Sequence, residues 1–257
     1  MAIKIAVAGK GGTGKTTFCG MLIDWMCKNG KSPILAVDAD ANSNLNEVLG
    51  VEVEITLGDV RELVATAENK LVSPIPVGMS KQDFMDHKLQ SALIEDDDFD
   101  LIVMGRTQGK GCYCFVNDLL QKELLKLEKG YKYMVVDNEA GMEHISRGVL
   151  PDVDYIVLVS DCSRRGVQAV ARIAELVKEV GMKPERVVLV VNRAPNGELN
   201  EGTKEEIEKH GLELIGVIPQ DEMVYQYDCD GNATCKLPES NAARRAVDNI
   251  AIKLFNK

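Results

Sequence analysis

The feature that most constrains this chain is a glycine-rich stretch near its N-terminus, which reads GKGGTGKT over residues 9–16. The apolar run Ile3–Ala8 before it predicts a short buried strand, and Thr17–Asn29 after it predicts a helix. A strand, a glycine loop and a helix in this order form the context in which G-x-x-x-x-G-K-T binds phosphate. Inward-pointing backbone N–H groups at the helix N-terminus favour an anion there. The stretch therefore predicts a nucleoside triphosphate site.

The side chains of this loop suggest separate roles. We expect Lys15 to reach the β- and γ-phosphates and the Thr16 hydroxyl to bind Mg²⁺. The other loop residues are expected to surround the phosphates, and they are Gly9, Lys10, Gly11, Gly12, Thr13, Gly14 and Thr17.

A second lysine, Lys10, follows the first glycine of the loop. It cannot easily fold back onto phosphates held by its own loop, so we expect it to point outward, toward a nucleotide held by a facing subunit. The alternative is a solvated lysine. The stretch from Lys10 to Thr16 resembles the deviant Walker A motif of the family that contains MinD, ParA and the nitrogenase iron protein. That resemblance implies ATP hydrolysis to ADP and phosphate by an ATP-dependent homodimer, in which Lys10 contacts the partner's nucleotide.

Short apolar runs alternate with helical stretches along the chain, which is typical of βαβ units with a parallel sheet. Their Val, Ile and Leu content fits strands covered on both faces. We therefore expect one α/β P-loop NTPase domain over residues 1–257, with a mostly parallel, roughly seven-stranded sheet covered by helices on both faces. The expected strands are Ile3–Ala8, Pro33–Val37, Leu101–Gly105, Tyr133–Val136, Tyr155–Val159, Val187–Val191 and Leu214–Val217.

The sequence predicts the helices between these strands in less detail than the strands themselves. Residues 50–98 are mostly helical in pattern, with an interruption at Pro74–Pro76. Val116–Glu128, Gly166–Val180 and Pro238–Phe255 predict further helices. The last of these is apolar on one face, and we expect it to pack on the core rather than to anchor the chain to a membrane.

Charge and composition argue against several function classes. A net charge of −10 and a pI near 4.9 disfavour sequence-independent DNA binding. We find no apolar run that could span a membrane and no signal-peptide pattern. The seven cysteines are expected to be reduced or metal-binding rather than paired. We expect a cytoplasmic protein that binds neither nucleic acid nor membranes.

Two aspartates, Asp38 and Asp40, lie at the end of the second expected strand. Ligands of open α/β sheets bind at the carboxyl ends of the strands, so both lie where phosphates are expected. The segment resembles switch I of the same family, which supplies an aspartate that positions the attacking water. We assign this role to Asp40, because its side chain begins the loop. Asp38 is the alternative, or an outer partner of Mg²⁺. Both could instead simply cap the next helix.

The strand Tyr133–Val136 is followed by Asp137, which fits a Walker B carboxylate that holds Mg²⁺ through water. Gly141 after it resembles the glycine of the family's switch II, which moves with the γ-phosphate. His144 lies close by in sequence and fits a surface histidine better than a sensor.

Base recognition is expected from two later segments. In the family, an asparagine that ends the strand corresponding to Val187–Val191 reads the adenine edge, which makes Asn192, with Arg193 next to it, the candidate here. Pro219 and Gln220 lie in a segment that resembles the loop over the base. Ordinary turns are the alternative, because Asn, Pro and Asp favour turns.

Cys112 and Cys114 lie in a glycine-flanked loop beside Lys110. Such thiols are expected to be exposed and prone to deprotonation. Thiolates select Zn²⁺, Ni²⁺, Cu⁺ or iron–sulfur clusters, and a closed site usually needs four of them. A twofold homodimer would bring two such loops together. The pair therefore predicts a metal site shared across the dimer, although C-x-C alone is a weak motif.

The position of these cysteines separates branches of the family. The nitrogenase iron protein places one cluster cysteine before switch II and one after it, whereas here both precede it and the next is Cys162. The chain resembles more closely the CooC family, accessory ATPases that insert nickel into carbon monoxide dehydrogenase. This implies a homodimeric metallochaperone with Ni²⁺, or Zn²⁺, at Cys112 and Cys114, and with carbon monoxide dehydrogenase as client. A MinD- or ParA-like switch ATPase and an iron–sulfur ATPase are the alternatives. We expect Cys162 to be structural, and Cys229 and Cys235 to lack a function.

Overall fold

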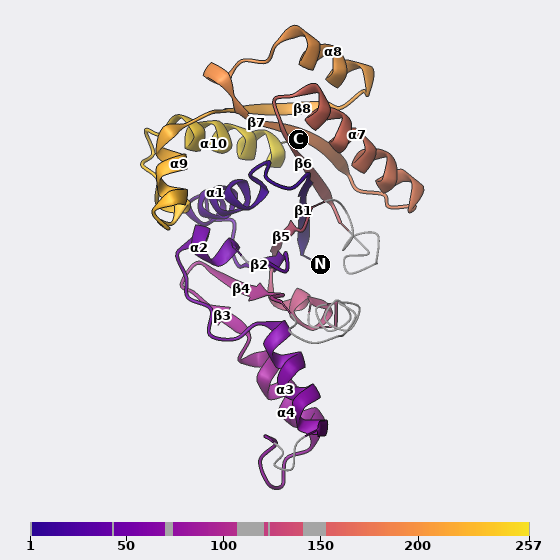
Figure 1. Ribbon diagram of the computed structural model, residues 1–257, viewed down its shortest axis with the longest axis vertical. Coiled ribbons are helices and arrows are strands. Elements are labelled where there is room, and N and C mark those ends of the chain that lie inside the picture. Colours follow the sequence, from indigo (N-terminus) through magenta and orange to yellow (C-terminus); the bar gives the residue numbers. More distant parts are fainter. Residues whose placement is uncertain are drawn as a thin grey trace.

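The computed structural model describes residues 2–42, 44–69, 74–106, 121–122, 124–140 and 153–256, without the side chains of residues 64–69 and 81. Within these ranges an eight-stranded sheet runs in the order β3-β4-β2-β5-β1-β6-β7-β8 (Figure 1). The strands are β1 Ile3–Gly9, β2 Ile34–Ala39, β3 Leu93–Glu95, β4 Phe99–Val103, β5 Tyr133–Asn138, β6 Tyr155–Asp161, β7 Arg186–Ala194 and β8 Glu213–Pro219.

The pairings confirm a mostly parallel α/β sheet. Each neighbouring pair is parallel except β3 with β4 at one edge. All of the strands expected from the sequence are present, and β3 is the one that the sequence pattern missed. It has three residues, none of which is buried, and it directly precedes the acidic turn at Asp96–Asp98. A short edge strand of this kind leaves no apolar run to detect.

Helices cover both faces of the sheet, as expected. One face carries α1, α2 and α10, and the other carries α7 with α8 packed on it, while α3 and α4 extend away from the body (Figure 1). The α-helices are α1 Lys15–Lys28, α2 Leu45–Leu49, α3 Leu57–Asn69, α4 Lys81–Gln90, α7 Arg164–Glu179, α8 Glu201–Lys209, α9 Glu222–Cys229 and α10 Ala242–Phe255. Short 3₁₀ turns are η1 Glu128–Gly130, η2 Pro195–Gly197 and η3 Thr234–Lys236.

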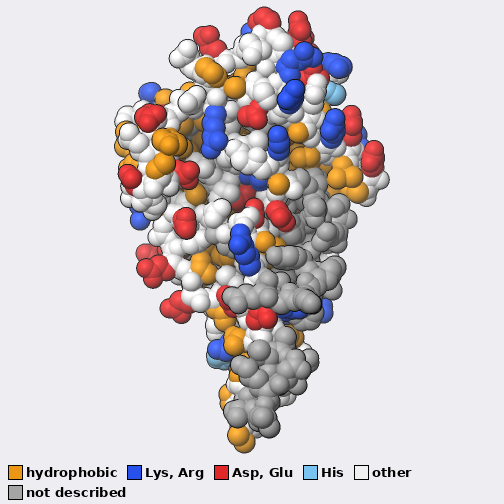
Figure 2. Space-filling view, viewed as in Figure 1, with side chains coloured by type: hydrophobic (Ala, Val, Ile, Leu, Met, Phe, Trp, Pro, Cys, Tyr) orange, Lys and Arg blue, Asp and Glu red, His pale blue; other side chains and the backbone are white. Residues whose placement is uncertain are grey.

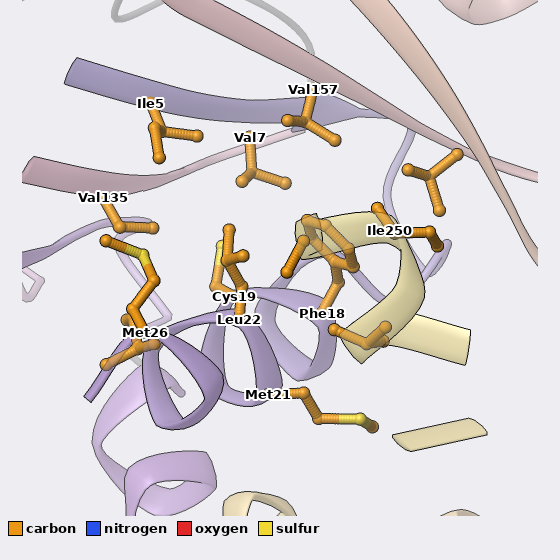
Figure 3. Close-up of a cluster of buried hydrophobic side chains, with 14 of the residues drawn as sticks. Ile5, Val7, Phe18, Cys19, Met21, Leu22, Met26, Val135, Val157 and Ile250 are labelled. Atoms are coloured by element: carbon orange, nitrogen blue, oxygen red, sulfur yellow. The ribbon is translucent and has the colours of Figure 1, made fainter. Parts of the chain in front are cut away.

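The side chains of each strand point alternately to the two faces of the sheet, and this divides the hydrophobic core into two clusters. On β1, Ala6 and Ala8 belong to the cluster on the α7 side, whereas Ile5 and Val7 belong to the cluster on the α1 side. Successive side chains of a strand point to opposite faces, so a strand buried on both faces reads as one continuous apolar run. Figure 3 shows Phe18 and Leu22 of α1 pointing toward Val7 of β1. This packing fixes α1, and with it the loop that leads into the helix.

The C-terminal helix α10 packs on β8 and α1. It begins at Ala242 rather than at Pro238, because the Asn241 side chain accepts from the Arg244 N–H and caps it. Val247, Ile250 and Leu254 are buried in the core, which agrees with a packed helix. In the described part of the chain, no helix is both long and apolar enough to cross a bilayer.

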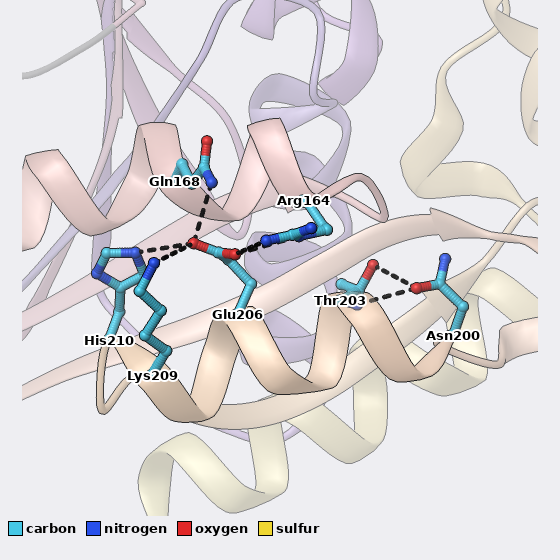
Figure 4. Close-up of polar contacts among 7 residues, drawn as sticks. All are labelled: Arg164, Gln168, Asn200, Thr203, Glu206, Lys209 and His210. Carbon is cyan, nitrogen blue, oxygen red and sulfur yellow. Dashed lines mark hydrogen bonds and ion pairs between the residues drawn. The ribbon is translucent and has the colours of Figure 1, made fainter.

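A buried carboxylate, Glu206, holds α8 against α7 (Figure 4). One oxygen accepts from the Arg164 guanidinium at 2.7 Å and the other from the Gln168 amide at 3.0 Å. Lys209 Nζ and His210 Nε2 lie 3.6 and 3.1 Å from the same side chain. The Arg164 contact, followed by that of Gln168, lowers the pKa of Glu206 to about 2.

We expect Glu206→Gln to destabilise the protein at pH 7 and to flatten its acid unfolding. A lowered pKa in the folded state contributes stability above the ordinary carboxyl value of 4.5, and this contribution is lost as the pH falls toward 2. Urea unfolding midpoints at pH 7 and pH 3 measure the difference, with the exposed Glu208→Gln on the same helix as control. Equal pH dependence in wild type and Glu206→Gln would contradict this role.

Candidate functional site

The loop between β1 and α1 has the backbone of a phosphate site. Gly14 has a φ of 87° and caps α1 without any side-chain hydrogen bond. The first N–H groups of a helix have no partner within the helix, so they point toward whatever occupies the loop. A Cβ on Gly9 would lie 2.2 Å from the carbonyl oxygen of Val159 on β6, so only glycine fits there. The fold therefore supplies the anion site that the sequence predicts.

Two neighbouring residues at the end of β7 brace this loop. The Asn192 amide donates to the Thr13 carbonyl at 2.8 Å, and the Arg193 guanidinium donates to the Gly12 carbonyl at 3.1 Å. Arg193 has a φ of 56°, a left-handed conformation that costs a non-glycine residue about 1 kcal/mol. Asn192, which the sequence predicts to read the base, thus contacts the phosphate loop, and the sequence did not predict this contact.

Two adjoining cavities flank the start of α1. One, of about 530 Å³, is lined by the phosphate loop with Lys15 and Thr16, by Asp40 after β2 and by Ala140 after β5. The other, of about 580 Å³, is lined by Asn192, Arg193, Pro219 and Gln220 among others. Both include Thr17, Arg193 and Asp228, so together they form one trough. Their size suits a ligand as large as a nucleotide. The predicted phosphate and base residues therefore lie along a single site.

Asp38 and Asp40 differ in their surroundings. Asp38 is fully buried, and its two oxygens accept from the backbone N–H groups of Asp40 and Leu45, each at 3.0 Å. Burial raises the pKa of Asp38 to about 6. Leu45 is the first residue of α2. The Asp38 carboxylate therefore contacts the N-terminus of the next helix, as the helix-capping alternative expects. Asp40 lines the phosphate cavity. The assignment of the attacking water to Asp40 stays a prediction that this placement permits.

Asp137 has the surroundings of a cation ligand. It is 1% exposed, and its Oδ1 has no hydrogen-bond partner. Burial, and then the charge of Asp38, raise the pKa of Asp137 to about 7, while the Thr16 hydroxyl and Lys15 oppose the rise. An unpartnered buried carboxylate oxygen is costly. A divalent cation between Thr16 and Asp137 would give it a partner, so these residues fit Mg²⁺.

The predicted thiol site, Cys112 and Cys114, lies outside the described residues, as do Lys110, Gly141 and His144. Within the described ranges no group of three or more His, Cys, Asp or Glu side chains is placed to hold a metal ion. Cys162 lies near the trough, where its thiol is 3.7 Å from the Arg193 carbonyl oxygen. Cys229 is exposed and Cys235 is buried, and both are free thiols. The metal site therefore stays a prediction from the sequence.

Comparison with known proteins agrees with a nucleotide-binding fold. Residues 4–234 match the family described as the CobQ/CobB/MinD/ParA nucleotide binding domain. An uncharacterized ATP-binding protein of Methanocaldococcus jannaschii is 42% identical over 98% of both chains. The carbon monoxide dehydrogenase accessory protein CooC of Rhodospirillum rubrum is 32% identical over 70% of this chain and 71% of its own.

A solved structure extends the comparison to the fold. The septum site-determining protein MinD of Pyrococcus horikoshii, in complex with Mg-ADP, superposes with a TM-score of 0.74. It covers 100% of this chain and 97% of its own at 22% identity. At this identity the likeness concerns the fold alone.

Proposed function

This chain belongs to the CobQ/CobB/MinD/ParA nucleotide-binding family of P-loop ATPases, and we propose that it is an ATP-hydrolysing homodimeric metallochaperone. Its cargo in this proposal is Ni²⁺, with Zn²⁺ as the alternative, held by Cys112 and Cys114 of two chains. Carbon monoxide dehydrogenase is the proposed client. The observation that carries the ATPase part is the single trough lined by Lys15, Thr16 and Asp40, together with the buried Asp137, which interacts with Thr16 and Lys15.

The proposal gives each residue of the trough a role in hydrolysis. The loop amides and Lys15 bind the phosphates, and Thr16 and Asp137 hold Mg²⁺, which neutralises phosphate charge when bound. Asp40, which lines the same cavity as Lys15 and Thr16, orients the attacking water in this proposal. Asn192 and Arg193 contact the base in this proposal, and they also donate hydrogen bonds to the Thr13 and Gly12 carbonyls of the phosphate loop. Lys10 is exposed on the loop, where it can reach a facing subunit.

The metal part of the proposal has two supports. The C-x-C pair supplies two thiolates per chain, and a twofold dimer would supply the four that a closed site needs. The similarity to the CooC protein of Rhodospirillum rubrum extends over 70% of this chain and gives the link to carbon monoxide dehydrogenase. The choice of nickel comes only from the family resemblance drawn from the sequence, since thiolates also suit zinc.

A switch ATPase like MinD is the second candidate. The MinD protein of Bacillus subtilis is 27% identical over 98% of this chain. A DNA-binding, ParA-like role is less favoured, because the net charge is −10 and the described face in Figure 2 mixes acidic and basic side chains. A third candidate, an iron–sulfur ATPase, would show visible absorbance after anaerobic purification.

ATP-dependent dimerisation through Lys10 is the direct test of the proposed assembly. We expect wild type to be monomeric with ADP and dimeric with a non-hydrolysable ATP analogue, measured as molar mass by light scattering. Lys10→Ala should bind the analogue and stay monomeric, because the contact across the interface is lost. Lys183→Ala, an exposed lysine far along the chain, serves as control. A Lys10→Ala dimer as tight as wild type would refute the proposed role of this lysine.

A further inference from the structure

The loop after β2 contains a hydrogen-bonded series that begins at Arg106, in the segment that follows the neighbouring strand β4. The Arg106 guanidinium donates to Oδ1 of Asn42. Asn42 in turn donates to Oδ1 of Asp40, from its backbone N–H at 2.8 Å and from its side-chain Nδ2 at 3.1 Å. Arg106 thus reaches Asp40 through one intermediate side chain. Asp40 and Asn42 both line the phosphate cavity.

The chemistry of the three groups makes this series directional. A guanidinium can only donate hydrogen bonds, and an ionised carboxylate can only accept them. The Asn42 amide lies between them with its oxygen toward Arg106 and its nitrogen toward Asp40. Rotating the amide by 180° would place an oxygen against the carboxylate and an NH₂ against the guanidinium, which is unfavourable on both sides. Arg106 therefore determines which end of Asn42 faces Asp40.

Contacts with β2 and α3 fix the backbone of the segment that contains Arg106 beside the loop of Asn42 and Asp40. β4 pairs with β2, with Val103 opposite Asp38, and the Met104 N–H donates to the Asp38 carbonyl at 2.9 Å. On its other side, α3 begins against the same segment. A Cβ on Gly58 would lie 2.4 Å from the Arg106 carbonyl oxygen, so only glycine permits this approach. The end of β4 is thus fixed beside the loop that contains Asp40.

From this geometry we infer that Arg106 is a positioning residue for ATP hydrolysis, which acts through Asn42 on the carboxylate of Asp40. The inference rests on the proposed role of Asp40. Arg106 does not line either cavity, so its loss should leave the contacts with ATP in place. Loss of the Arg106 side chain should instead reduce the fraction of time that the Asp40 carboxylate faces the attacking water. A smaller fraction lowers kcat and leaves the affinity for ATP unchanged.

Steady-state ATP hydrolysis by Arg106→Ala, Arg106→Lys and Asn42→Ala tests the inference. We expect Arg106→Ala to lower kcat about tenfold with KM within about twofold. Arg106→Lys should recover part of the loss, because a lysine can also donate to Asn42. Asn42→Ala should lower kcat as much as Arg106→Ala does. The double variant Arg106→Ala/Asn42→Ala should lower kcat no further than either single variant, since the two residues act as one unit. Urea midpoints show whether each variant is folded.

The outcomes separate this inference from the proposed function. Unchanged kcat in Arg106→Ala, or a double variant whose loss is the product of the single losses, overturns the positioning role. Asp40→Ala is measured alongside. If Asp40→Ala retains hydrolysis, the assignment of the water to Asp40 fails, and the positioning role fails with it. If Asp40→Ala loses hydrolysis while Arg106→Ala does not, the inference about Arg106 alone is wrong.

Discussion

Replacing Lys15 with alanine is expected to lower ATP turnover by at least about a hundredfold at saturating Mg-ATP. Lys15 is 7% exposed and begins α1, and its Nζ lies 3.5 Å from the Lys10 carbonyl oxygen. It is thus held inside the loop before any nucleotide arrives. Charge that develops on the transferred phosphoryl group is stabilised mainly by groups already in place, and removing one such donor costs orders of magnitude in kcat.

Phosphate release gives the rate of Lys15→Ala, and calorimetric titration with Mg-ATP gives its affinity. The matched control is Lys28→Ala, which removes a lysine from the last turn of the same helix, where its side chain is 49% exposed. The control should hydrolyse ATP at the wild-type rate, within about twofold. A Lys15→Ala enzyme as active as this control would mean that the trough is not the hydrolysis site.

Removing both thiols of the C-x-C pair is expected to abolish metal binding. In the proposed dimer, Cys112→Ala/Cys114→Ala removes all four sulfur ligands of the shared site at once. Its metal content should fall to background after anaerobic purification with added Ni²⁺ or Zn²⁺. Hydrolysis of ATP should persist, because the proposal gives neither cysteine a role in binding the phosphates or in orienting the water. The exposed thiol of Cys229 provides the control, so Cys229→Ala should keep the full metal content.

Much of the fold was predictable because its strands are buried on both faces. Residues 5–8 of β1 and residues 155–159 of β6 are all apolar and buried, so continuous runs mark these strands in the sequence. The edge strand β3 escaped detection because it is short and not buried. The start of α10 was placed too early, because Pro238 is a plausible first helical residue and only the geometry shows that Asn241 makes the cap.

The residues of the candidate site were predictable where they belong to a short sequence motif or directly end an apolar run. The phosphate loop and Asp40 lie at the ends of β1 and β2, and Asp137 is in the last residues of β5. A parallel sheet brings the ends of its strands to one edge. The contacts that hold them come from far along the chain and have no sequence signal. Asn192 is 179 residues from Thr13, and Arg106 is 64 residues from Asn42. Which side chain reaches which loop depends on strand order, and composition and spacing do not determine that order.

The most direct test of the metallochaperone proposal is the number of nickel or zinc ions per chain, measured by elemental analysis on wild type at a known molar mass. The protein is purified anaerobically and held in the ATP-bound state with a non-hydrolysable analogue. The proposal predicts a dimer with one ion for its two chains, and no bound ion in Cys112→Ala/Cys114→Ala at the same mass. A dimer that forms with the analogue and binds no metal, or that binds metal equally without these thiols, would contradict it.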